Sequence, residues 1–259
     1  MSARSRPIAI LMYHQVDEAP PKGSALRGLV VAPRTFYRHM AIMRLLGYRG
    51  VSMSELEPYL RGQKSGKVFG ITFDDGYANN LHRALPVLRR FGFTSTCYIV
   101  PSLLGKTNAW DAGHDIAQVP LMNTAELQVW LAAGQELGSH TLTHARLTAL
   151  DADQMPAEVA GSRVVLESTL QMPGGIRHFC YPYGAYNAAA IEAARAGGYT
   201  TATTTDRGRV LPGDHADLLR LPRVSVSRTT TWLHLLLKCF TRYEDKRAPR
   251  PAAGKTSFV

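Results

Sequence analysis

The stretch ITFDDGY, residues 71–77, ends an apolar run with two adjacent carboxylates and a glycine. The apolar residues are typical of a buried strand, so Asp74 and Asp75 lie where that strand leaves the core. Adjacent carboxylates oppose each other's ionisation, because like charges at short range raise one pKa at the expense of the other. A nearby cation would remove this conflict. The stretch therefore predicts a cation beside the end of a strand.

Short apolar runs alternate with amphipathic stretches along the chain, which is the pattern of repeated βα units around a mostly parallel sheet. With 259 residues, of which 45% are hydrophobic, the chain fits one large α/β domain. The expected strands are 7–13, 48–52, 67–73, 94–100, 135–139, 178–182, 199–205 and 222–227. The expected helices include one that carries Phe36, Met40, Met43 and Leu46 and ends at Gly47, then 151–170 and 187–196, with capping boxes at Ser52–Glu55 and Asn123–Glu126.

The C-terminal part of the chain differs from the rest. We expect the domain to span residues 1–230, followed by a helix at 231–243 and a basic, Pro-rich, disordered tail at 244–259. The helical segment TWLHLLLKCF, 231–240, is strongly apolar. Such a helix either completes the core or rests on a membrane surface.

The charge of the chain limits its partners. Thirty Lys and Arg against 20 Asp and Glu give a net charge of +10, which favours anionic partners such as glycans, lipid headgroups or nucleic acid. The basic residues are scattered and no nucleic-acid motif accompanies them, so we expect no nucleic-acid partner. Peripheral contact with an anionic membrane surface remains open, and composition does not predict the oligomeric state.

The cysteines and the N-terminal sequence indicate the cellular compartment of the protein. The three cysteines are widely spaced without a C-x-x-C pair, which disfavours a disulfide framework or a cysteine zinc cluster. The N-terminal MSARSRPIAILMYHQV has too short an apolar run for a secretory signal, and no run of 18 apolar residues predicts a membrane span. We therefore expect a cytoplasmic protein, peripheral at most to the inner membrane face.

A second polar group follows another predicted strand. In GSHTLTH, His140 and His144 come directly after 135–139, and the carboxyl ends of parallel strands meet at one face of such a fold. Histidines four residues apart can reach one ion when the backbone between them turns. With one carboxylate they make a His₂-Asp set that leaves positions open for water and substrate, as in catalytic zinc sites. The neighbouring carboxylate is then free to act as a base toward the activated water.

Each motif also has a structural explanation. A lone Asp-Asp pair commonly forms a turn or helix N-cap, and a lone H-x-x-x-H commonly belongs to a surface or a core. A third segment, FCYPYGAYN at 179–187, joins a strand to a turn, with Pro182 fixing φ. The amide of Tyr183 can point into the same mouth as an oxyanion donor, and Tyr181, Pro182 and Tyr183 can line a sugar subsite. An ordinary turn with packed aromatics is the alternative.

Three of these segments together resemble the polysaccharide deacetylases of carbohydrate esterase family four, the NodB-homology domain. TFDDG (72–76), SHTLTH (139–144) and YPYG (181–184) resemble its first three motifs in order, and the similarity spans about residues 7–228. The resemblance implies a distorted (β/α)₇ barrel that removes N-acetyl groups from amino sugars of a glycan. It also implies roles: Asp74 as general base, Asp75, His140 and His144 as ligands of zinc or a similar divalent ion, and the Tyr183 amide as oxyanion donor.

Two departures from the main branch of the family concern the base and the acid. An arginine that steadies the base normally opens the third motif, but Cys180 occupies that position here. Arg223, in LPRVSV, is the candidate replacement in the substrate-binding region, since an arginine in an apolar segment needs a carboxylate partner. The Leu-x-His motif that supplies the general acid is also absent after Tyr183.

The first predicted strand offers that acid. LMYHQV, 11–16, resembles the start of the permuted branch that deacetylates poly-N-acetylglucosamine, where the last-motif histidine lies on the first strand. The resemblance transfers the general-acid role to His14, because an imidazole side chain is suited to donating a proton to an amine. Alternatively, His14 caps the strand and packs under Tyr13.

Two other functions remain open at this stage. The chain could be a metal-dependent amidase or deformylase acting on another small or lipid-linked substrate. It could instead be an inactive protein of this fold that binds glycans, although an intact Asp-Asp-His-His set disfavours that alternative.

Overall fold

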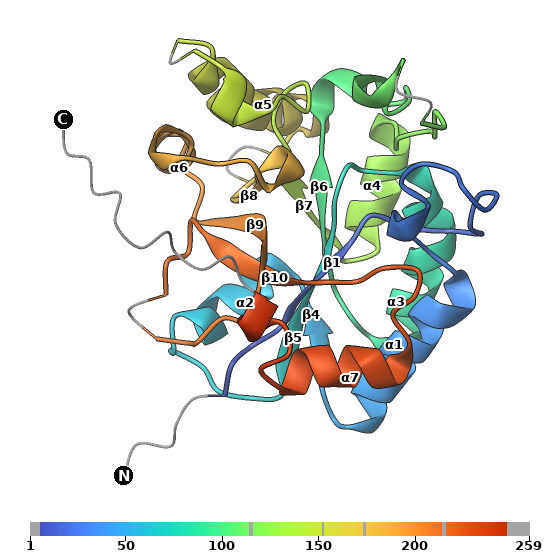
Figure 1. The fold of residues 1–259 in the computed structure, drawn as a ribbon. Helices are drawn as coiled ribbons and strands as arrows, with labels where there is room; N and C mark the ends of the chain where they lie inside the picture. The colour runs from blue at the N-terminus through green and yellow to red at the C-terminus, as the bar shows by residue number, and fades with distance from the viewer. Residues whose placement is uncertain (1–5, 114–115, 152, 173–174, 214–215, 248–259) are drawn as a thin grey trace.

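Parallel strands form a closed barrel in the computed structural model, which describes residues 6–113, 116–151, 153–172, 175–213 and 216–247. Seven strands follow one another in the order β1, β10, β9, β8, β7, β6, β5, and β5 pairs back onto β1 (Figure 1). β4 (Arg49–Val51) adds to the first half of β5. The barrel strands are β1 (Ile10–Tyr13), β5 (Val68–Phe73), β6 (Thr96–Ile99), β7 (Glu136–Ser139), β8 (His178–Cys180), β9 (Thr201–Arg207) and β10 (Leu221–Ser225).

Helices surround the barrel, as expected for βα repeats (Figure 1). Asn123 and Glu126 form a complete capping box, and Ser52 accepts a hydrogen bond from the Glu55 amide. Among the described residues, no helix combines the length and apolar character that crossing a membrane requires. The helices are α1 (Pro33–Leu45), α2 (Met53–Leu60), α3 (Leu85–Phe91), α4 (Thr124–Ala132), α5 (Met155–Leu170), α6 (Ala188–Ala196) and α7 (Trp232–Phe240).

The predicted single α/β domain with a (β/α)₇ barrel is therefore confirmed. Every expected strand is present, with ends that differ by a few residues. Two very short strands, β2 (Gln15–Val16) and β3 (Val30–Val31), were not expected; they pair outside the barrel and hold together the base of the loop between them. That loop forms one wall of the cleft described below.

The described residues include four, 244–247, of the expected tail. Glu244 is fully buried, because Arg207 binds its carboxylate through two nitrogens and Lys238 of α7 binds it at 3.1 Å. Residues Asp245–Arg247 form a short 3₁₀ turn, and Asp245 pairs with Arg209. These ion pairs attach the end of α7 to the barrel. The rest of the expected tail, 248–259, lies outside the described residues.

A buried histidine connects α1 to the start of the C-terminal region. His39 Nδ1 lies 3.0 Å from the Tyr13 hydroxyl and Nε2 lies 2.8 Å from the Thr230 carbonyl oxygen. A neutral ring satisfies both contacts, with Nε2–H donating to the carbonyl and Nδ1 accepting from the hydroxyl. Burial lowers the pKa of His39 to about 4.

This histidine makes stability depend on pH. Its pKa is lower in the folded state than the ordinary value of about 6.5, so the unfolded chain binds the extra proton between those values. The stabilisation is complete above pH 6.5 and is lost as pH falls toward 4, by about 3 kcal/mol in all. Urea unfolding at a series of pH values gives the free energy of unfolding as a function of pH. We expect His39→Gln to flatten this curve between pH 4 and 6.5 and the exposed-site variant His82→Gln to leave it unchanged. Parallel wild-type and His39→Gln profiles would refute the assignment.

Candidate active site

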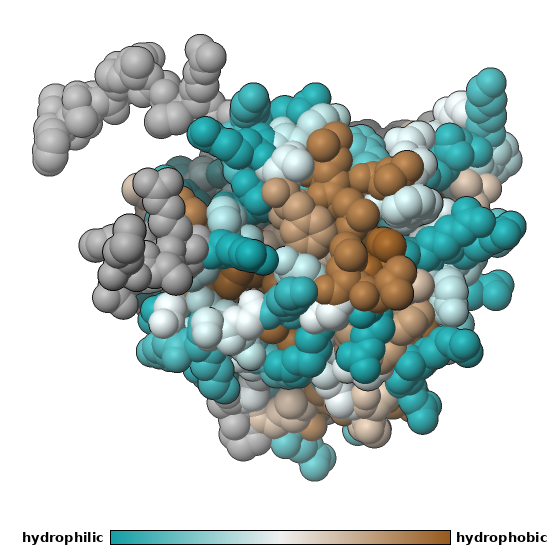
Figure 2. Space-filling view, turned by 90° about the horizontal axis from the view of Figure 1, so that it is seen from below, coloured by the Kyte–Doolittle hydropathy of each residue, from teal (hydrophilic) through white to brown (hydrophobic). Residues whose placement is uncertain are grey.

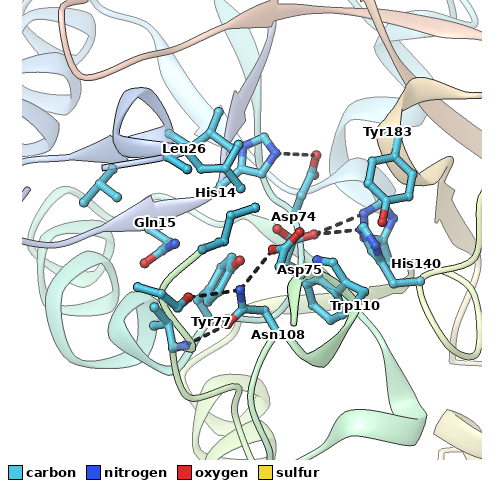
Figure 3. A pocket seen from close by; sticks show the side chains of 18 of the residues that line it. His14, Gln15, Leu26, Asp74, Asp75, Tyr77, Asn108, Trp110, His140 and Tyr183 are labelled. Carbon is cyan, nitrogen blue, oxygen red and sulfur yellow. Dashed lines mark hydrogen bonds and ion pairs between the residues drawn. The ribbon is translucent and has the colours of Figure 1, made fainter. Parts of the chain in front are cut away.

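A cleft of about 770 Å³ opens where the barrel strands end (Figure 3). His14 follows β1, Asp74 and Asp75 follow β5, and His140 follows β7. The parallel topology therefore brings together side chains that lie far apart in sequence. The loop between β2 and β3 and the loop around Trp110 form further walls. The lining includes His14, Gln15, Leu26, Leu29, Asp74, Asp75, Tyr77, Asn108, Trp110, Asp111, His140, His144, Arg146, Tyr181, Tyr183 and Thr205.

Asp75, His140 and His144 converge on one point. Asp75 Oδ1 lies 3.3 Å from His140 Nε2 and 3.4 Å from His144 Nε2, and all three residues are buried. The backbone supports this arrangement at a cost, since Asp75 and His144 both have positive φ, 75° and 67°. Burial raises the pKa of Asp75, but hydrogen bonds from His140 and His144 outweigh burial and hold that pKa well below its usual range.

These three residues fit a divalent cation. Their nitrogen and oxygen donors all lie within 4.8 Å of one another. His140 Nδ1 lies 2.8 Å from the Cys180 carbonyl oxygen, so Nδ1 carries a proton. When an ion replaces the proton on Nε2, that nitrogen would present its lone pair to the shared point. The His144 ring is held by stacking on Trp110, with centroids 4.2 Å apart. Two imidazoles and one carboxylate are a preferred donor set for zinc.

Asp74, His140 and Cys180 also have donor atoms close together, but a cation fits there poorly. Both carboxylate oxygens of Asp74 already bind Arg223, and the Cys180 sulfur lies 3.2 Å from Arg223 Nη2. A metal ion at that point would lie against a guanidinium charge. The Asp75 set is therefore the better metal site.

Asp74 is held by Arg223 rather than by the two histidines. Nη1 and Nη2 of the guanidinium bind the two carboxylate oxygens at 2.7 Å each. Nε donates to the Thr204 carbonyl, and Nη1 also donates to the Thr72 hydroxyl. Burial raises the pKa of Asp74, but the Arg223 charge and hydrogen bonds outweigh burial and keep it below the ordinary value. Asp74 is thus an ionised carboxylate with a fixed orientation.

The position of Arg223 differs from the predicted one, which was in contact with the substrate. Its side chain is fully buried behind Asp74 and does not line the cleft. The guanidinium contacts the sulfur of Cys180, the residue at the position where the main branch of the family has its arginine. The Arg223 guanidinium therefore lies next to that position. The expected carboxylate partner is Asp74.

His14 faces Asp74 across the cleft, and Figure 3 shows the ion pair between them. Its Nε2 is 3.8 Å from Asp74 Oδ2, and its Nδ1 has no hydrogen-bond partner among the described residues. Asn80 fixes the backbone here, because its side-chain amide donates to the His14 carbonyl at 2.7 Å. The imidazole lines the cleft, and the side chain of the preceding Tyr13 is fully buried.

The turn after β8 supports the opposite wall. Tyr183 has φ 58° and Gly184 φ 64°, and a Cβ at Gly184 would lie 1.8 Å from the Thr205 hydroxyl oxygen, so only glycine fits there. The Tyr183 ring meets the His144 ring edge-on at 4.6 Å and carries Arg146 over its face at 4.3 Å. Tyr181 lines the cleft but is fully buried, with its hydroxyl donating to the Leu219 carbonyl. Pro182 is buried and lies outside the cleft lining.

Comparison with known proteins identifies the family of this chain. A family model described as polysaccharide deacetylase matches residues 61–202, which is more than half of the chain. The chain belongs to the polysaccharide deacetylase family. The matched range contains Asp74, Asp75, His140, His144 and Tyr183, whereas His14 and Arg223 lie outside it.

Individual proteins are similar to this chain in sequence or in fold. YxkH of Bacillus subtilis (strain 168), whose name assigns it to the polysaccharide deacetylases, is 30% identical over 203 residues, covering 78% of this chain. The alignment covers 65% of YxkH. The deacetylase PplD of Streptococcus pyogenes, solved with acetate, shares the fold with a TM-score of 0.77, 23% identity and coverage of 91% and 99% of the two chains. IcaB of Ammonifex degensii shares it with a TM-score of 0.75, 23% identity and coverage of 90% and 96%.

Several cleft residues of this chain could not be found from sequence. Trp110, Asn108 and Arg146 lie in loops without hydrophobic periodicity or a motif. Asn108 shapes its loop, because its side chain donates to Asp111 at 3.0 Å and accepts from the Val119 amide at 2.7 Å. The only local signal was the presence of an aromatic residue in the polar stretch TNAWDAG, 107–113, which does not indicate what the ring contacts.

Proposed function

We propose that this protein is a metal-dependent hydrolase that removes N-acetyl groups from amino sugars of a polysaccharide or lipid-linked glycan. One observation carries the proposal. The two adjacent aspartates have separate partners, with Asp75 on the two histidines and Asp74 on Arg223 and near His14. A site with one ligand carboxylate and one free, ionised carboxylate suits hydrolysis better than structural metal binding.

Asp75, His140 and His144 would hold the ion, zinc first among divalent metals. When bound, such an ion polarises the acyl carbonyl and lowers the pKa of water toward neutrality. Asp74 would take the proton from the attacking water. Arg223 keeps that carboxylate ionised and oriented before substrate arrives, so little reorganisation is needed in the transition state.

The remaining steps use the walls of the cleft. The Tyr183 amide would donate to the developing oxyanion; the turn does not use this N–H for its own bonds, which run from Gly184 to Tyr181 and from Ala185 to Pro182. His14 would protonate the departing nitrogen, leaving acetate and a free amino sugar. The aromatic rings of Trp110 and Tyr183 offer apolar faces to a sugar ring next to the ion site.

Acetate release from a chitooligosaccharide tests this proposal. We expect loss of one acetyl group per reacting sugar by mass spectrometry, abolished by a chelator. Release of formate from an N-formyl sugar without release of acetate would favour a deformylase. Tight binding of the glycan without any release would favour a glycan-binding protein.

The role of His14 is tested by changing the leaving group. We expect His14→Gln to lower turnover of an N-acetyl amino sugar by roughly 10²–10⁴-fold, because the amine must be protonated as it leaves. Hydrolysis of 4-nitrophenyl acetate should fall much less, since a phenolate leaves without a proton. The matched control is His82→Gln, at an exposed histidine that does not line the cleft. Equal losses on both substrates would assign His14 a structural role.

A further inference from the structure

An exposed apolar surface lies on α7 and the end of α1. It comprises Trp232, Leu233, Leu237 and Phe240 of α7 with Leu45 and Leu46, and we call these six residues the α7 patch. They account for six of the 13 exposed large apolar side chains among the described residues, so exposed apolar surface is concentrated here. Figure 2 shows a continuous brown area on the side of the molecule where α7 and α1 lie side by side in Figure 1.

Packing within the domain does not account for this surface. α7 already buries another face, because Leu235 and Cys239 are in the core and Lys238 donates to the Ser225 carbonyl. A helix that only completes a core needs one apolar stripe, with polar residues outside. On α7 the outward side is apolar too, with Leu233 61% exposed. An outward apolar area of this kind marks an interaction site.

The surroundings of the α7 patch are basic. Lys67 donates to the Leu46 carbonyl, and its ammonium lies 5.8 Å above the ring of Tyr48, which itself packs on Phe240. At the other side, Arg247 stacks on Tyr243 at 3.6 Å, and Tyr243 packs on His234 of α7.

Acidic groups near the patch do not cancel this charge. The carboxylates of Glu244 and Asp245 are engaged by Arg207, Lys238 and Arg209. The chain that continues beyond Arg247 has Arg250 and Lys255 and no acidic residue up to residue 259. Apolar side chains flanked by Lys67 on one side and Arg247 on the other match an interface of acyl chains below anionic headgroups.

We propose that the α7 patch binds an anionic lipid membrane. Leu233, Leu237 and their aromatic neighbours enter the interface, and the basic rim contacts the headgroups. A second copy of the chain is a poorer occupant, because it would bring another net charge of +10 against this face. The Arg228 amide, just before α7, donates to the Gly28 carbonyl in the cleft loop at 2.9 Å. The membrane would therefore hold the protein at α7, and the segment just before α7 is hydrogen-bonded to the loop that forms one wall of the cleft.

Vesicle co-sedimentation of the full chain tests this inference independently of the deacetylase reaction. Vesicles contain phosphatidylcholine with 30% phosphatidylglycerol, or phosphatidylcholine alone. We expect binding to the anionic vesicles, at least tenfold weaker in 0.5 M salt and at least tenfold weaker for the double variant Leu233→Ser/Leu237→Ser. The matched control is Val164→Ser on α5, which is 64% exposed and lies outside the patch, and it should bind like wild type.

Two further measurements make the result decisive. Circular dichroism melting checks that the double variant is folded, and a blue shift of tryptophan fluorescence on anionic vesicles should disappear in Trp232→Phe. Equal binding of wild type and the double variant, or no binding to anionic vesicles, would overturn the inference. A dimer in sedimentation velocity that the double variant abolishes, without vesicle binding, would assign the patch to self-association instead.

Discussion

Replacing Asp74 by asparagine should lower deacetylation by roughly 10²–10⁴-fold while the metal content stays unchanged. Asparagine has nearly the same shape and can still contact Arg223, but it cannot accept a proton from water. The ion site is left intact, because its carboxylate comes from Asp75. Acetate release and metal analysis by mass spectrometry on the same sample give both results.

Two matched variants complete this test. Asp75→Asn should lose both metal and activity, since it removes a ligand, and Asp153→Asn, at an exposed site, should change neither. Wild-type turnover by Asp74→Asn would show that another group is the base. Loss of metal from Asp74→Asn would show that the two aspartates share the ion.

The second large effect concerns Arg223. Replacing this arginine by methionine leaves the Asp74 carboxylate buried without its partner, and breaking a buried ion pair in this way costs about 3–5 kcal/mol. Urea unfolding of Arg223→Met should show that loss. Adding Asp74→Asn to the same chain should restore a large part of it, because the unpaired charge is then gone.

Arg223→Lys separates orientation from charge. Lysine keeps the positive charge but cannot bind both carboxylate oxygens as a planar fork, so turnover should fall even where the protein remains folded. The exposed neighbour variant Arg220→Lys should retain wild-type turnover. If Arg223→Met were as stable as wild type, or if Arg223→Lys were fully active, the pair would not have the role proposed for it.

The barrel could be predicted because its signals are local. Each strand is a short apolar run between amphipathic stretches, and a parallel sheet then places the strand ends on one face. The same rule brought Asp75, His140 and His144 together, although 65 residues separate Asp75 from His140. The Arg223–Asp74 pair followed from the cost of burying an arginine without a carboxylate.

The parts that could not be predicted depend on long-range contacts of irregular chain. Trp110 stacks on His144 through a loop whose path is fixed by Asn108, and no period or motif in the sequence encodes that path. Glu244 looked like part of a charged tail. It is buried because Arg207 of β9 and Lys238 of α7 both bind its carboxylate. Nothing in the sequence around Glu244 indicates these partners. Arg223 was expected near the substrate, but it lies behind Asp74 and outside the cleft lining. Its depth depends on the register of β10, which the sequence does not indicate.

The proposed mechanism depends on one catalytic metal ion held by Asp75, His140 and His144, and this proposal can be checked directly. It is tested most directly by removing metal with a chelator, adding back zinc, and measuring bound metal and acetate release from a chitooligosaccharide at each stage. We expect one ion per chain in the reloaded protein and activity that disappears and returns with the ion. The double variant His140→Ala/His144→Ala should show neither bound metal nor activity. Full acetate release by the metal-free protein, or equal metal binding by the histidine variant, would contradict it.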